Sequence, residues 1–501
     1  MKRRLYAPAV LVVGLLSAQI VATAHVYLAN LDLMRTTEAV MRSGYLAVPN
    51  ARVAEHLNTL ATAMAGGLFF TLSIGAGLSV VTLIGAWLWD RAFRRRRTAI
   101  YFYLLIWAAG LVLVNDNGLN LVASAYLVVV PLITAVAAIK LLPARTTMVS
   151  SAGVFWPVSA AIILALLWSL VLDRHMFSNI RDHLLLGNRA GQSITDAYYA
   201  YTLFPAEAFK SLEQKQLRTC VLGSSLDRAN WTRLERTVRA HDYLPIPAGY
   251  PADLTIGQHT DNKHFSLESD RQSVLSVPTD ELLGSPDKAL TAYSKQLDRN
   301  HMFRTLTLAC LLLGLPLVLF GFLFSVLGML PSLFLTGAVS DVIAAISCIV
   351  VGGILLVPVY QGHTATTVPA DPSMAFSASS PNIRIAVLRQ ACEDQRDIAA
   401  EVRIQGIENS PHIAERYWLA RSLAYTRVPA AYAMLLALAD DPVPIVVCQA
   451  LWALGARKDQ DAVPEIINRI NTSSHWYIQM YGYRALRTLG WVQPRSPQLS
   501  Y

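Results

Sequence analysis

The sequence predicts a polytopic α-helical membrane protein of about seven spans, with an extramembrane α+β domain and a C-terminal α-solenoid. Three observations lead to this fold class. Hydrophobic residues make up 54% of the chain and charged residues only 15%, and the mean hydropathy is +0.39. Several apolar runs exceed 18 residues, which is enough to cross roughly 30 Å of hydrocarbon. Toward the end of the chain, short apolar helices recur at a regular spacing.

The expected spans fall in two groups. Residues 1–172 contain five, over residues 6–29, 65–89, 99–114, 119–139 and 153–172. Residues 303–360 form a membrane hairpin of two more, over 303–327 and 341–360. The start also resembles a secretory signal peptide, because MKRR precedes an apolar stretch and Ala22-Thr23-Ala24 offers a cleavage site; with or without cleavage of residues 1–24, residue 31 lies outside.

Lysine and arginine in the short loops predict the orientation. One side collects Lys2, Arg3, Arg4, Arg91, Arg94, Arg95, Arg96, Arg97, Lys140 and Arg145, whereas the opposite loops contain only Arg35, Arg42 and Arg52. We therefore expect a multi-pass protein of the cell inner membrane with a cytoplasmic N-terminus. The domain at 173–302 and the tail then lie on the periplasmic side. If residues 303–360 cross once or three times, the tail lies in the cytoplasm instead.

The net charge of +8 is concentrated in a few short segments, so we interpret it as a topology signal and expect no nucleic-acid partner. The basic cluster Arg91, Arg94, Arg95, Arg96 and Arg97 also favours anionic lipid head groups. Each charge contributes about 1 kcal/mol near an anionic surface. Retention of the loop on the cytoplasmic side is a sufficient explanation by itself.

The polar stretch 173–302 predicts an α+β domain. RTCVLGSS is typical of a buried strand, and DRANWTRLERTVRAH of a helix with Asp227 as N-cap. LTIGQHTDNKHFSLES and QSVLSVPTDELL indicate strands or loops. Ser285-Pro286-Asp287 begins a helix that can continue unbroken into the sixth span. Two further features lie in this stretch. The aromatic string Tyr198, Tyr199, Tyr201 and Phe204 is interpreted as domain core rather than as a docking surface. His175 and His183 flank Arg181-Asp182, and we expect these residues on a polar juxtamembrane face.

The tail repeats itself. PNIRIAVLRQAC starts at residue 381, PHIAERYWLARSLA at 411, PVPIVVCQALWALG at 442 and HWYIQMYGYRALRTLG at 475. Second helices lie between them: RDIAAEVRIQGI, VPAAYAMLLALADD and QDAVPEIINRI. A helical hairpin cannot bury its apolar face alone, so neighbouring units stack. Ala420, Ala450 and Ala485 hold comparable places where helices approach closely, and Pro442 marks a joint between units.

These units resemble the HEAT-like repeat family over about 110 residues, within an expected repeat domain at 368–492. The resemblance implies a protein-binding or architectural surface and supplies no catalytic residue. An ordinary helical bundle with accidental periodicity is the alternative. Residues 1–367 resemble no family that we recognise.

Motifs for chemistry are sparse. Five cysteines form no CxxC or CxxCH pattern, and there is no P-loop, HExxH or GxSxG sequence. We therefore predict no catalytic residue and no cofactor. His259, Asp261 and His264 form the best metal-like group because His and Asp ligate zinc, but a solvated loop is the favoured interpretation. Within the second span, Ser73, Gly75 and Gly77 predict close helix packing.

Three functional hypotheses remain. We favour a non-catalytic membrane scaffold or accessory subunit that binds membrane or periplasmic proteins through its outer domain and repeats, with membrane lipids around its spans. The second is a component of an export system for lipid, polysaccharide or another envelope substrate. The third is an enzyme at the outer membrane interface, for which His259, Asp261 and His264 are the residues to test.

Overall fold

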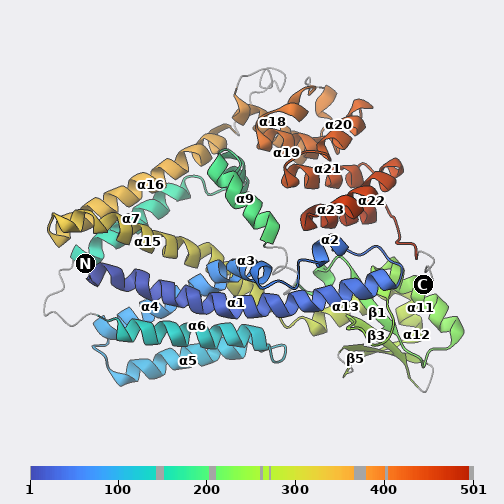
Figure 1. Cartoon of the computed structure of the whole chain (residues 1–501), viewed down its shortest axis with the longest axis horizontal. Helices are drawn as coiled ribbons and strands as arrows, with labels where there is room; N and C mark the ends of the chain where they lie inside the picture. Colours follow the sequence, from blue (N-terminus) through green and yellow to red (C-terminus); the bar gives the residue numbers. More distant parts are fainter. Residues whose placement is uncertain are drawn as a thin grey trace.

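The computed structural model has three parts: a module of long apolar helices, a small sheet domain and a helical-repeat domain (Figure 1). It describes residues 2–142, 152–201, 210–259, 263–269, 272–365, 380–400 and 404–495. The N-terminus lies at one end of the apolar module, and the sheet and repeat domains lie toward its other end (Figure 1). The predicted three-part organisation is observed, and the insertion of the apolar module in a membrane remains a prediction.

Six helices of the described chain are long and apolar enough to cross a membrane. They are α1 (Lys2–Arg42), α3–α4 (Leu60–Phe70 and Ala76–Arg91, joined by the π-helical turn Thr71–Gly75), α5 (Arg97–Val114), α6 (Leu121–Lys140), α14–α15 (His301–Ala309 and Leu315–Met329, joined by the π-helical turn Cys310–Gly314) and α16 (Gly337–Ala365). The predicted span 153–172 forms α7 (Ala152–Ser169), which packs along α16. Its described apolar stretch is shorter than those of the six, so a count of seven crossings stays a prediction. α1 is longer than the predicted span 6–29, because residues 30–42 continue the same helix.

Small residues bring these helices together. A Cβ atom on Gly314 would lie 2.6 Å from Gly77 Cα, so the two glycine backbones touch. A Cβ atom on Gly75 would lie 2.4 Å from Ala18 Cβ, and Ser73 is fully buried. Such small residues permit the close backbone approach on which helix pairs in lipid depend. The packing role predicted for Ser73, Gly75 and Gly77 is confirmed.

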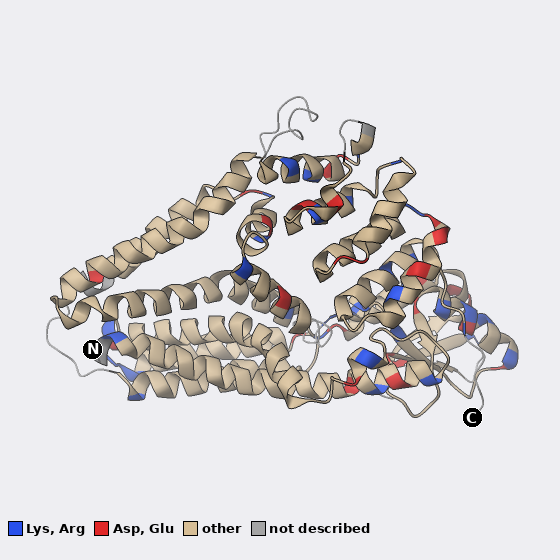
Figure 2. Cartoon of the chain, turned by 45° about the horizontal axis from the view of Figure 1, so that its top comes forward, with Lys and Arg blue, Asp and Glu red and all other residues tan. Residues whose placement is uncertain are grey.

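Charged residues are nearly absent along the long helices and gather at their ends (Figure 2). Arg4 forms a 2.5 Å ion pair with Asp341 and also donates to the Gly328 carbonyl, which places the α15–α16 turn beside the start of α1. Tyr6 donates to the Ala138 carbonyl at 3.1 Å, so the end of α6 lies there too. This arrangement is consistent with the predicted hairpin at 303–360.

The sheet domain contains five strands in the order β2-β1-β3-β4-β5. They are β1 (Arg218–Leu222), β2 (Tyr243–Pro245), β3 (Leu254–Gln258), β4 (His264–Ser269) and β5 (Gln272–Pro278). β1 pairs in parallel with β2 and β3, and the other pairs are antiparallel. The crossover helix α11 (Arg228–Ala240) begins where Asp227 accepts a 2.7 Å hydrogen bond from the Asn230 amide, as predicted for an N-cap. Helices α12 (Thr279–Gly284) and α13 (Pro286–Leu297) complete the α+β domain.

The helix predicted to run unbroken from the sheet domain into the sixth span is interrupted between α13 and α14. The amide of Asn120, in the α5–α6 turn, donates to the Arg299 carbonyl at 3.0 Å and to Asn300 Oδ1 at 2.7 Å. These bonds stabilise a non-helical backbone at residues 298–300, where helical hydrogen bonds are missing. The prediction of a continuous helix is therefore wrong. The α5–α6 turn contacts the chain at this break between α13 and α14.

The repeat domain alternates two kinds of helix. The first helices of the units are α18 (Pro381–Glu393), α19 (Ile413–Ser422), α21 (Pro444–Ala456) and α23 (Trp476–Thr488), and the second helices are α20 (Ala430–Leu438) and α22 (Val463–Thr472). The predicted second helix RDIAAEVRIQGI differs from expectation: its described part contains the 3₁₀ turn Ile398–Ala400 and the start of another, Ile407–Asn409, while residues 401–403 lie outside the described chain. The first unit therefore lacks a regular second α-helix among its described residues.

Candidate interaction site of the repeat domain

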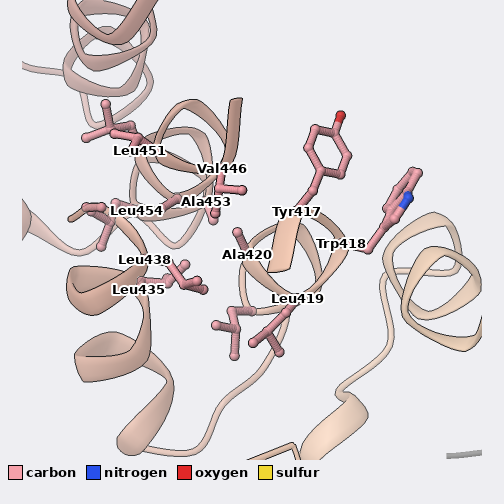
Figure 3. Packing of buried hydrophobic residues seen from close by; sticks show 14 of the residues in the cluster. Tyr417, Trp418, Leu419, Ala420, Leu435, Leu438, Val446, Leu451, Ala453 and Leu454 are labelled. Atoms are coloured by element: carbon pink, nitrogen blue, oxygen red, sulfur yellow. The ribbon is translucent and has the colours of Figure 1, made fainter. Parts of the chain in front are cut away.

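The first helices of the repeats form the centre of the domain. Ala420 and Ala450 are fully buried and Ala485 is 2% exposed, and a Cβ atom on Gly455 would lie 2.7 Å from Ala485 Cα. Figure 3 shows Ala420 of α19 facing the neighbouring helices, with Leu435 on the α20 side. Small side chains at these places let the helices stack, as the spacing predicts. Pro442 lies exposed at the joint before α21.

One side of α19 is occupied by another part of the same chain. Tyr417 and Trp418 lie on the side of α19 away from α20 (Figure 3). Trp418 Nε1 donates a 2.7 Å hydrogen bond to Asp182 Oδ2, in the π-helical turn Ile180–Leu185 that follows the short helix α8 (Met176–Asn179). Arg181 pairs with Asp182 at 2.7 Å, and its guanidinium lies 3.9 Å from the centre of the Tyr417 ring. A charged pair and two aromatic side chains thus join the apolar module to the repeats.

A second set of contacts surrounds the first. Arg389 of α18 donates a 2.8 Å hydrogen bond to Asn179 Oδ1, and both residues are buried. His183 packs tightly on α16, where a Cβ atom added to Gly362 would lie 2.0 Å from the His183 ring. Burial, opposed in part by the Asp182 carboxylate, lowers the pKa of the His183 imidazole below its ordinary value. The packing of His183 against α16 therefore favours the neutral imidazole over the charged form.

The aromatic string resolves into one half-buried residue, Tyr199, and two exposed residues. Tyr199, near the end of α9 (Arg189–Tyr201), packs against the repeat core with its ring 4.6 Å from that of Tyr477. Burial raises the pKa of the Tyr199 hydroxyl. Tyr198 and Tyr201 are 48% and 42% exposed. The prediction that the string forms the core of its own domain is therefore wrong for the described residues, because Tyr199 packs on the repeat domain. Phe204 lies outside the described residues.

The last repeat helix binds the sheet domain. Asp242, in the turn before β2, forms a 2.7 Å ion pair with Arg487 and accepts a 3.1 Å hydrogen bond from the Tyr483 hydroxyl. Arg487 also donates to the Ala240 carbonyl at 2.9 Å. Two side chains of α23 thus contact the same carboxylate, which fixes the position of the repeat domain relative to the sheet domain.

The turn after α1 forms the third attachment. Asn50 caps the short helix α2 (Ala51–Ala54) through its side-chain oxygen. Its amide donates to the Ile470 carbonyl at 2.9 Å and to the Ser473 carbonyl at 3.1 Å, at the end of α22. The backbone amide of Asn50 donates in turn to Gln479 Oε1 at 3.0 Å. One buried asparagine therefore satisfies backbone groups on two modules at once.

A cavity of about 290 Å³ lies where the three modules meet, between α1, the sheet domain and α23. Its lining includes Asp32, Lys215, Asp253 and Trp476. Lys215 pairs with Asp253 at 2.7 Å, and Thr219 donates to the same carboxylate at 2.9 Å. Burial pushes the pKa of Asp253 upward, but the Lys215 ammonium and the Thr219 hydrogen bonds outweigh it, and the pKa lies below its ordinary value. The charges of this cavity are largely satisfied within the protein.

Comparison with known families supports the assignment of the C-terminal array. A protein-family model described as HEAT repeats matches residues 400–487. These units are HEAT repeats. The resemblance predicted from the tail is confirmed for this region, here called the HEAT array. No curated protein and no solved structure matches the chain.

The HEAT array leaves one face free. Every residue of α19 except Arg421 is buried, and α21 is nearly as covered. The second helices differ, because α20 exposes Ala433 and Ala437 and α22 exposes Asn468. We name the surface formed by the exposed residues of α20 and α22 the free face. It is the side of the HEAT array that the rest of the described chain leaves open.

The basic cluster lies in the α4–α5 turn. Asp90 is buried and pairs with Arg95 at 2.8 Å and with Arg91 at 3.6 Å. Within the described residues, Arg94, Arg96 and Arg97 have no carboxylate partner and are exposed. The sequence identified this cluster, whereas the division between two paired and three unpaired arginines required the fold.

The metal-like group is only partly described. The His259 amide donates to the His264 carbonyl at 3.0 Å, so the two histidines face each other across the β3–β4 hairpin. Asp261 lies outside the described residues. Over the parts of the chain with described positions, no three His, Cys, Asp or Glu residues gather in a metal-binding arrangement.

Sequence reasoning missed the residues that dock the HEAT array. Asp182, Asp242 and Asn50 lie in short polar stretches without a recognisable motif, and each acts through a contact more than 200 residues away. The GYLAVPN turn before α2 and the pair Arg181-Asp182 are the only local signals, since both place polar groups next to apolar segments.

Proposed function

We propose that the protein is a non-catalytic membrane scaffold whose HEAT array binds a partner protein through its free face. The observation that carries this proposal is the division of the array's surface. The first helices are covered by the apolar module, by Tyr199 and by the sheet domain, so an external partner meets α20 and α22. Solenoids commonly use such an uncovered surface of stacked helices for binding.

The charge of the free face suggests the nature of the partner. Tyr432 of α20 lies within electrostatic reach of Asp459, Asp461 and Glu465, and burial together with these carboxylates raises the pKa of its hydroxyl. An aromatic side chain beside acidic groups suits a partner surface with basic and apolar residues. We expect this partner to be a membrane or periplasmic protein.

Site-specific photo-crosslinking in intact membranes tests the proposal. A benzophenone amino acid at Ala437 or Asn468 is expected to capture a discrete protein, because both side chains are exposed on the free face. The same probe at Thr232, exposed on α11, serves as the control. The double charge reversal Asp461→Lys/Glu465→Lys should abolish capture at Ala437. Equal labelling at Thr232, or capture unchanged by the reversal, would refute the assignment of this face.

Deletion of the whole array is a less selective experiment. The array holds the turn after α1, the π-helical turn and the sheet domain together, so its removal would uncover all three surfaces. Surface substitutions leave these attachments intact and change only the free face.

Export of a lipid or envelope polymer is a second candidate function, supported by an apolar cavity of about 490 Å³ between α4, α5 and α6. Protein reconstituted in vesicles that moves a fluorescent phospholipid between leaflets would support transport. The scaffold proposal predicts transfer at the rate of protein-free vesicles.

A further inference from the structure

The cavity between α4, α5 and α6 is a groove with an apolar lining. The lining includes the small residues Gly85 and Ala86 of α4 and Ala135 of α6, and the aromatic residues Tyr103 and Trp107 of α5. Tyr103 and Trp107 stack with their ring centres 5.4 Å apart. The volume of about 490 Å³ is in the range of small-molecule sites.

Hydrogen bonds hold α5 in place beside this groove. The Tyr103 hydroxyl donates to Thr82 Oγ1 at 3.2 Å, and the Trp107 indole donates to the Leu127 carbonyl. The side of α5 that does not line the groove is apolar and uncovered: Leu105 is 66% exposed and Val112 is 70% exposed. The groove is therefore part of the surface that would face lipid if these helices span a membrane.

The basic turn between α4 and α5 lies beside the groove. Trp89 and Phe93 line the groove, and Trp89 Nε1 donates to the Arg96 carbonyl at 3.1 Å. Arg94, Arg96 and Arg97 are exposed at this turn and have no carboxylate partner within the described chain. Arg91 and Arg95 share the single carboxylate of Asp90, at 3.6 Å and 2.8 Å. The apolar groove thus lies beside unpaired cations. An apolar groove suits the acyl chain of an anionic lipid, and the cations suit its phosphate.

We propose that the groove holds an acyl chain of one anionic phospholipid, whose phosphate is bound by Arg94, Arg96 and Arg97. The apolar wall supplies contact with the chain, and the guanidinium groups supply bidentate hydrogen bonds to phosphate oxygens. The proposal depends on the membrane insertion of these helices and is independent of the free face of the HEAT array.

Native mass spectrometry of the full-length protein tests the site with two probes, phosphatidylglycerol and phosphatidylethanolamine. The parent protein is expected to retain phosphatidylglycerol preferentially. In the variant Arg94→Gln/Arg96→Gln/Arg97→Gln this preference should fall at least ten-fold, because each cation near an anionic surface changes affinity by about five-fold. Retention of phosphatidylethanolamine should fall less, because its ammonium group offsets the charge of the phosphate that these arginines bind.

A second variant tests the chain-binding part of the groove. Ala135→Trp fills the groove and should reduce retention of both lipids, whereas Val136→Trp, whose parent residue is 44% exposed on the same helix and does not line the groove, should not. Ala86→Phe replaces the first variant if Ala135→Trp elutes as an aggregate in size-exclusion chromatography.

The arginine variant has its own matched control, Arg228→Gln/Arg233→Gln/Arg236→Gln, which removes three exposed cations from α11. The proposal is overturned if this control loses the phosphatidylglycerol preference to the same extent, or if the preference survives in the α4–α5 turn variant. Equal retention in Ala135→Trp and Val136→Trp would also overturn it.

Discussion

Replacing Asp182 tests how the repeats are attached to the apolar module. Its carboxylate is completely buried, accepts from Trp418 Nε1 at 2.7 Å and pairs with Arg181, whose side chain is 23% exposed. Asp182→Ala leaves the buried indole N–H unsatisfied, which costs about 1–3 kcal/mol. Arg181 loses its ion-pair partner but is partly exposed and regains some hydration. Breaking this pair therefore costs less than the roughly 3–5 kcal/mol of breaking a fully buried pair. We expect a local destabilisation of about 3 kcal/mol.

Hydrogen exchange of the α19 amides in the full-length protein measures this effect locally. A loss of about 3 kcal/mol accelerates exchange through local opening on the order of 100-fold. Asp182→Asn keeps an acceptor for Trp418 and removes only the charge, so its effect should be several times smaller. Asp461→Ala, in an exposed turn of the same domain, should leave α19 unchanged.

A double-mutant cycle then isolates the Asp182–Trp418 interaction. Trp418→Phe removes the donor, and in this background Asp182→Ala should cost less than in the parent, with a coupling of about 0.5–3 kcal/mol. Exchange in α19 that is identical in Asp182→Ala and Asp461→Ala would refute the inferred attachment.

Three further predictions concern packing, capping and pH. Ala450→Leu should lower stability by about 1–3 kcal/mol because its site has no free volume, whereas Ala437→Leu on the exposed side of α20 should be near neutral in thermal unfolding. Asn50→Ala removes the N-cap of α2 and the hydrogen bonds to the end of α22. Amide hydrogen exchange at the end of α22 should therefore be faster, by an amount that corresponds to a local destabilisation of about 1–3 kcal/mol. For His183, burial lowers the pKa below 6.5, so the unfolded state binds more protons and stability, complete above about pH 6.5, falls as the pH drops. Melting temperatures between about pH 7 and pH 5 should therefore decrease less in His183→Gln than in the parent.

Local patterns were sufficient for several parts of the fold. The period of about 30 residues in the tail predicted the HEAT repeats, because each helical hairpin carries its own apolar stripe. Asp227 marked the start of α11, because an N-cap requires only its own side chain and the next turn. The same local logic failed at residues 298–300, where the bonds from Asn120 in a distant turn stabilise a break that the sequence near α13 does not indicate.

The candidate site was less accessible to sequence reasoning than the fold. The arginine run of the α4–α5 turn was visible from composition, but the groove beside it depends on how three helices pack. The aromatic string predicts the core of its own domain, but Tyr199 is half-buried against the HEAT array instead. The sequence places Asp182 on a polar juxtamembrane face, and only the fold shows that its carboxylate is buried and accepts a hydrogen bond from Trp418.

The sequence alone determined which segments are apolar, where helices begin and that the tail repeats, since hydrophobic periodicity and capping act over a few residues. Only the tertiary structure decided that the first helices of the HEAT array are covered by the chain itself and that α20 and α22 remain open. The physical reason is that an amphipathic helix specifies the need to bury one face, but the identity of the covering surface depends on contacts between residues far apart in the chain.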